Sequence, residues 1–133
     1  MTQFGDIQNN AVAYQLFKPQ AITTTTTSTY VDMGEGGGGQ FGTTMEVQRG
    51  AVTGTSPTLD VKLTECDTTN GTYSDMSGAT FAQLTTSGAD GDALGIKTVF
   101  TRSKRYVKAV ATTGGTNPSF TVSLTIKEQK RVV

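Results

Sequence analysis

The residues that most often carry out enzyme chemistry are scarce in this chain. It contains no histidine, so it lacks the commonest general base and the commonest metal ligand. Cys66 is its only cysteine, which excludes an internal disulfide and a site built from several thiolates. No Ser-His-Asp or Cys-His arrangement can form, and we expect Cys66 to be a buried structural thiol. We therefore predict no catalytic residue, no cofactor and no metal site, and we predict that the protein is not an enzyme.

Two glycine-containing motifs match ligand-binding patterns only in form. The glycines of residues 34–39 fit the G-x-G-x-x-G spacing, but that fingerprint needs a strand before it and a helix after it. Residues 42–47 have the alternation of a strand instead, so we interpret residues 34–39 as a glycine-rich loop. Residues 90–92, Asp-Gly-Asp, lack the further oxygen ligands of a calcium loop and are interpreted as a solvated turn.

The charged residues argue against nucleic acid and membranes as partners. Eleven Lys and Arg balance eleven Asp and Glu, so the formal net charge is zero. Such a chain lacks both the counterion-releasing surface of a nucleic-acid binder and the polybasic patch of a membrane-surface protein. We interpret the local group of cations as the exposed start of a strand rather than a phosphate site, with a salt-bridging contact to an acidic partner as a further alternative. This group comprises Arg102, Lys104, Arg105 and Lys108.

The elements that would position these residues are strands. The 133 residues fit one domain, and they include 16 glycines and 26 threonines, a composition that favours pleated sheets over helices. Apolar and polar residues alternate most clearly in residues 59–64 and 120–127, and residues 105–112 form a further strand whose apolar set we expect to face the core. Two short strands are expected around a turn at residues 77–78. We predict an all-β fold: a single β-sandwich, immunoglobulin-like or jelly-roll, with an extended N-terminal arm.

The first 28 residues are predicted to form this arm, and residues 29–133 the sandwich domain. Within the arm we expect a strand at residues 12–17 that ends before Pro19, and a threonine run at residues 23–27 suited to a sheet edge. The start of the sequence shows neither the charged nor the apolar stretch of a secretory signal, which predicts synthesis in a reducing compartment.

A weak internal repeat relates two turns. Residues 54–63 align without a gap on residues 115–124, an offset of 61, and each copy has a Gly-Thr-polar-Pro turn between strands. Glycine permits positive φ and proline cannot donate to a sheet, so both residues belong at a turn. We expect two equivalent β-hairpins, one in each half of the sandwich.

Four runs of strand and turn residues stand out, at residues 58–65, 73–81 and 104–110 and in the final Gly-Thr-Asn-Pro-Ser-Phe-Thr-Val-Ser strand. Together these runs resemble the head decoration, or cement, proteins of tailed bacteriophages. The resemblance covers about residues 52–126. It implies a β-sandwich that binds the exterior of the phage capsid, made in the bacterial host cytoplasm. It implies the major capsid protein as the partner and a homo-oligomer, with a trimer favoured and a dimer as the alternative. The role would be to stabilise the shell, with no catalysis.

An arm of twenty residues costs about 20–40 kcal/mol of backbone entropy to order, so we expect it to order against a partner surface. The predicted contacts to the capsid or to a neighbouring subunit are Phe4, Ile7, Tyr14, Leu16 and Phe17. Deleting residues 1–18 is expected to abolish capsid binding and to leave the sandwich folded.

The alternative function is a carbohydrate-binding or receptor-binding module of a tail fibre or adhesin. Such modules present aromatic rings on an exposed face. The chain has no tryptophan, and most of its aromatic residues occupy alternating positions typical of a core. Exposure of Tyr30, Tyr73 or Tyr106 would favour this alternative.

Overall fold

The computed structural model describes residues 11–34, 40–81, 83–86, 94–99 and 102–130. These residues form seven strands and no helix, so the predicted all-β class is confirmed. All strands join one sheet, and every pairing in it is antiparallel. The strands are β1 (Ala11–Ile22), β2 (Thr26–Thr27), β3 (Val31–Asp32), β4 (Gln40–Cys66), β5 (Ser74–Thr80), β6 (Leu94–Val99) and β7 (Tyr106–Lys130).

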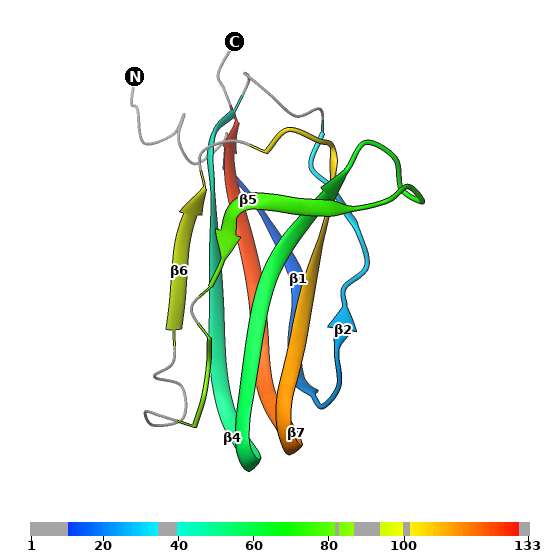
Figure 1. Cartoon of the computed structure of the whole chain (residues 1–133). Helices are drawn as coiled ribbons and strands as arrows, with labels where there is room; N and C mark the ends of the chain where they lie inside the picture. The colour runs from blue at the N-terminus through cyan, green and yellow to red at the C-terminus, as the bar shows by residue number, and fades with distance from the viewer. Residues whose placement is uncertain (1–10, 35–39, 82, 87–93, 100–101, 131–133) are drawn as a thin grey trace, which may run out of the picture.

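Two long strands, β4 and β7, form the centre of the sheet. They pair with each other from Gln40 opposite Lys130 to Cys66 opposite Tyr106. Figure 1 shows that this two-stranded ribbon folds back on itself, so that its two halves face each other. One half of the ribbon consists of residues 40–53 of β4 and residues 119–130 of β7; β6 pairs with this part of β4 and β1 with this part of β7. The other half is extended by β2 and β3, which pair with β7, and by β5, which pairs with β4.

The fold-back occurs at the two copies of the sequence repeat. Gly54 and Gly115 both have positive φ, +116° and +94°, and the equivalent residues Ser56 and Asn117 both have a φ of 49°. The repeat therefore corresponds to a repeated backbone conformation. The expectation of two separate hairpins is wrong, because the strand after each turn pairs with the other copy rather than with the strand before it. The two turns lie side by side, with Thr55 opposite Thr116.

One hydrophobic core lies between the two halves of the ribbon. The three alternating segments predicted from sequence each contribute their apolar set, including the expected face of residues 107–111. Burial of these side chains is the main favourable term in folding. The core residues that β4 and β7 contribute are Met45, Val47, Leu59, Val61, Leu63, Val107, Ala109, Ala111, Phe120, Val122, Leu124 and Ile126.

Strand β1 begins at Ala11 and continues past the predicted end at Pro19 to Ile22. Pro19 is tolerated because the pairing with β7 is irregular between Phe17 and Gln20, and proline fits a bulge where no ladder hydrogen bond is required. The side chains of Leu16 and Phe17 are buried in the core of the same chain. Residues 11–22 are thus an integral part of the sheet.

The peripheral strands match the predictions made from the sequence only in part. β2 lies within the threonine run and pairs with β7, as expected of a sheet edge. The two short strands predicted around residues 77–78 are instead one strand, β5, with a bulge. Four residues, 76–79, lie between the pairs Lys62–Thr80 and Thr64–Asp75, where β4 has only Leu63. Gly78, with a φ of +79°, permits this bulge.

Candidate binding face

Three of the four tyrosines lie on one face of the folded sheet. Along the first half of β7, Val107, Ala109 and Ala111 are buried, so Tyr106 and Lys108 project to the opposite side. We call this surface the tyrosine face and define it by Tyr30, Asp32, Tyr73, Arg105, Tyr106 and Lys108.

Tyr30 and Tyr106 form an aromatic corner at one side of this face. Their ring centroids are 5.4 Å apart and their planes meet at 88°, an edge-to-face arrangement. The Arg105 guanidinium lies 5.4 Å from the centroid of Tyr106. Tyr30 is 45% exposed, the exposed large hydrophobic residue among those whose side chains the structure describes.

A charged pair fixes the polar side of this corner. Arg105 donates from Nε and Nη2 to the two carboxylate oxygens of Asp32, at 2.8 Å each. The backbone N–H of Gly34 donates to the same carboxylate at 2.9 Å. These hydrogen bonds lower the pKa of Asp32 from 3.8 to about 2, with Arg105 as the main cause. The carboxylate is therefore ionised and held in place at neutral pH.

Tyr73 forms the other side of the tyrosine face, in the segment that follows β4. Its ring lies under the Lys108 ammonium, with Nζ 4.4 Å from the centroid. Its hydroxyl donates to the Thr69 carbonyl at 3.1 Å, and burial raises the pKa of Tyr73 above its ordinary value. A cation over an aromatic ring and a hydrogen bond to the backbone restrict the orientation of this side chain.

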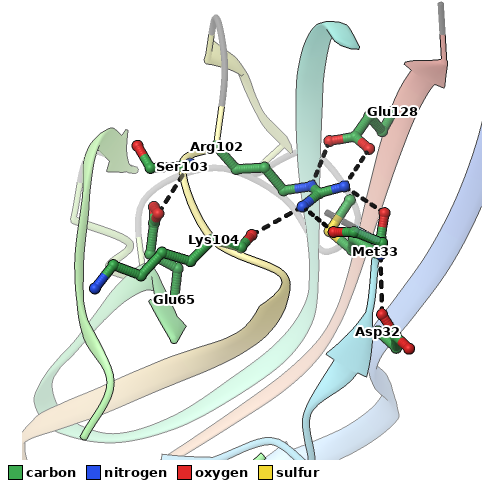
Figure 2. Close-up of polar contacts among 8 residues, drawn as sticks. Asp32, Met33, Glu65, Arg102, Ser103, Lys104 and Glu128 are labelled. Atoms are coloured by element: carbon green, nitrogen blue, oxygen red, sulfur yellow. Dashed lines mark hydrogen bonds and ion pairs between the residues drawn. The ribbon is translucent and has the colours of Figure 1, made fainter. Parts of the chain in front are cut away.

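A buried arginine anchors the strand that carries Asp32. Arg102 and Glu128 are both fully buried and share two hydrogen bonds. Arg102 also donates to the carbonyls of Met33 and Gly34, directly after Asp32, as Figure 2 shows. The interpretation of Arg102 as part of an exposed cationic cluster is wrong, because its guanidinium is surrounded by protein acceptors. It holds β3 in place from the inside.

Cys66 is buried, as predicted, and it faces the segment that leads to Tyr73. Hydrogen bonding from the backbone of Thr68 lowers the pKa of the Cys66 thiol. A β-carbon on Gly71 would approach Cys66 Sγ to 2.6 Å, so the chain is tightly packed over the sulfur. The cysteine contributes to packing under the face.

The residues predicted from sequence as contact sites do not gather on one surface. Leu16 and Phe17 are in the core, which leaves them little surface to present to another protein. Tyr14 is half-buried on β1, and burial, with Glu128 nearby, raises its pKa. Phe4 and Ile7 lie outside the described residues. Tyr30, Tyr73 and Tyr106 were predicted as indicators of the alternative function, but no local sequence signal places these three positions together.

The described residues contain no group of three or more Cys, Asp or Glu side chains placed to hold a metal ion. Within them no helix has the length and apolar character required to cross a membrane. Comparison of the sequence with protein families finds no match, and comparison with curated proteins finds none either.

Proposed function

We propose that the chain is a structural virion protein that binds the outer surface of a phage capsid and bridges major capsid subunits. In this proposal the folded sheet is a β-sandwich, and the tyrosine face is the contact surface. The observation that carries it is the aromatic corner of Tyr30 and Tyr106, held by the Arg105–Asp32 pair on a rigid sheet. The resemblance of residues 52–126 to decoration proteins supplies the partner.

The composition of the tyrosine face suits a protein partner. Tyrosine and arginine are enriched in the central, energetically dominant parts of protein interfaces. A tyrosine whose orientation is already restricted loses little conformational entropy on binding, and the contacts of Tyr73 and Tyr106 provide such restriction. The opposed charges of Asp32 and Arg105 leave the corner close to neutral, so binding would depend on shape and apolar area.

The remaining parts of the proposal concern assembly. Phe4, Ile7 and Tyr14 are retained as contacts to the capsid or to a neighbouring subunit, in addition to the tyrosine face. We propose a homo-oligomer, with a trimer favoured, because a bridging protein at a symmetry axis of a shell repeats the same contact in each copy.

A binding assay with capsids that lack this protein tests the proposal. Purified chain is added to such capsids, and the bound fraction is measured by sedimentation across a concentration series. Tyr30→Ala is expected to weaken binding by about tenfold or more, as for a central interface tyrosine. Ser77→Ala, at an exposed residue of β5 that belongs to none of the proposed contacts, is the control and should bind within about twofold of the wild type.

Mass spectrometry of purified particles gives an independent measure. We expect about one-third to one copy of this chain per major capsid subunit, as symmetric coverage of the shell requires. A handful of copies per particle would place the protein in the tail or fibres. Absence from the particles, or Y30A binding equal to the wild type, would refute the proposed contact.

One observation favours the alternative function, a carbohydrate-binding or receptor-binding module. Tyr30 is the exposed aromatic residue that this alternative requires, and the fixed charges of Asp32 and Arg105 beside it are able to hydrogen-bond sugar hydroxyls. Binding of the chain to an array of immobilised glycans, lost in Tyr30→Ala and absent from capsids, would establish the alternative. Binding to capsids alone would exclude it.

A further inference from the structure

The exposure of Tyr30 arises from an extra residue in the edge strand. Thr27 pairs with Val110 and Val31 pairs with Val107. Three residues, 28–30, therefore lie opposite only two, 108 and 109. The extra residue makes a bulge between β2 and β3, seen in Figure 1 as the segment that bends away from β7 between these two strands.

Ser28 makes the hydrogen bonds that begin this bulge. Its backbone N–H donates to the Ala109 carbonyl at 2.9 Å. The Ala109 N–H does not bond to a backbone carbonyl in return but donates to the hydroxyl oxygen of Ser28, also at 2.9 Å. In a regular antiparallel pair this donor would bond to the carbonyl of residue 28. The serine side chain thus takes the place of its own carbonyl in the ladder.

The same hydroxyl also holds the backbone as it leaves the sheet. Ser28 Oγ donates its proton to the Thr29 carbonyl at 2.9 Å. Ser28 is only 8% exposed; its hydrogen bond from Ala109 is buried and its hydrogen bond to Thr29 is partly buried. One buried hydroxyl therefore satisfies the Ala109 donor and orients the peptide group after residue 28, directly before Tyr30.

We infer that Ser28 is a positioning residue that directs Tyr30 onto the tyrosine face, at the corner with Tyr106. In a regular ladder continued from Thr27, Tyr30 would pair opposite Val107, whose side chain is buried, and its ring would face the core. With the bulge it meets Tyr106 edge to face instead. The inference concerns the geometry of the corner; its importance for binding rests on the proposed function of the tyrosine face.

Tyrosine nitration by tetranitromethane, mapped by peptide mass spectrometry, tests the positioning without any partner. In the wild type we expect Tyr30 to react fastest of the face tyrosines, because it is the most exposed. Ser28→Ala is expected to slow nitration of Tyr30 at least threefold relative to Tyr14, since the backbone returns toward the regular ladder. Ser28→Thr keeps the hydroxyl and should retain the wild-type rate. Ser77→Ala, at an exposed serine of β5, is the matched control.

Near-ultraviolet circular dichroism supplies a second readout, because the chain has no tryptophan and tyrosine dominates the signal. The tyrosine band is expected to change in Ser28→Ala and to be preserved in Ser28→Thr. If Ser28→Ala fails to fold, Ser28→Cys keeps a side chain of similar size but has only a weak thiol donor and acceptor, and it should change the band and the nitration rate in the same direction. Unchanged Tyr30 reactivity in the folded Ala variant or in the Cys variant would overturn the inference.

Capsid binding by the same variants separates the two proposals. If Ser28→Ala alters Tyr30 reactivity and also weakens capsid binding while Ser28→Thr does neither, both the positioning and the contact are supported. If reactivity changes and binding does not, Ser28 still positions Tyr30, and the tyrosine face is not the capsid contact.

Discussion

Arg102 and Glu128 meet in the interior through two parallel hydrogen bonds, 2.7 Å from Nε to Oε2 and 3.0 Å from Nη2 to Oε1. Both side chains are fully excluded from solvent. The other guanidinium protons are donated to the carbonyls of Met33, Gly34 and Lys104. Because these acceptors surround the cation, its desolvation is compensated, and one side chain connects β7, the segment before it and the end of β3.

Removal of the charge on Glu128 should destabilise the protein strongly. In Glu128→Gln the Arg102 cation stays buried without its counter-ion, for which about 3–5 kcal/mol of unfolding free energy is expected to be lost. Urea denaturation followed by circular dichroism measures this. The control is Asp75→Asn, which breaks the exposed Lys62–Asp75 bridge and should cost less than about 1 kcal/mol. If Glu128→Gln lost as little unfolding free energy as Asp75→Asn is expected to lose, the buried pair would not be needed for stability.

The sequence predicted the core well and the polar interior poorly, for a physical reason. Alternation of apolar residues is local, so the buried set of each strand, including Val61 on β4 and Val122 on β7, is visible in any short window. Arg102 lies in a cationic segment that looks like surface, and its partner Glu128 is 26 residues away. Only the pairing of β7 with the rest of the sheet brings these two groups together.

The tyrosine face and the pairing of the repeat also depend on contacts between distant residues, which a short stretch of sequence does not reveal. Tyr30 is directed outward by a bulge whose signal is a single serine in a threonine-rich run. The repeat at Gly54 and Gly115 was visible in the sequence, and its shared backbone conformation follows from local residue types. Which strands pair after each turn depends on contacts between distant segments, so the expectation of two separate hairpins failed.

The side-by-side turns predict a strong requirement for glycine at position 115. A β-carbon there would lie 2.5 Å from the Ser56 carbonyl oxygen, and the φ of +94° is unfavourable for any other residue. Gly115→Ala is expected to lower the unfolding free energy by about 1–3 kcal/mol or more. Gly50→Ala is the control, because its nearest contacts would be at 3.6 Å, and it should change stability by less than about 1 kcal/mol. Thermal unfolding of both variants checks this, and a neutral Gly115→Ala would contradict the turn geometry.

The Asp32–Arg105 pair makes part of the stability depend on pH. The pKa of Asp32 is lowered in the folded state from 3.8 to about 2, so its ionised form is favoured by folding. The resulting stabilisation is fully present above the unfolded pKa and is lost as the pH falls from about 4 toward 2. The difference in stability between the wild type and Asp32→Asn, from urea titrations at several pH values, should be constant above about pH 5 and shrink below pH 4. A difference independent of pH down to 2 would contradict the assigned pKa.

The position of β1 changes the expected result of N-terminal truncation. Deletion of residues 1–18 removes part of β1 with Leu16 and Phe17, two buried core residues whose truncation typically costs about 2–5 kcal/mol each. That loss approaches the whole stability of a domain of this size, so we expect this variant to be unfolded by circular dichroism rather than folded and unable to bind. Deletion of residues 1–10 leaves β1 intact and should preserve the unfolding midpoint. The shorter deletion is therefore the variant that tests Phe4 and Ile7 as capsid contacts: reduced sedimentation with capsids at unchanged stability supports them, and full binding rejects them.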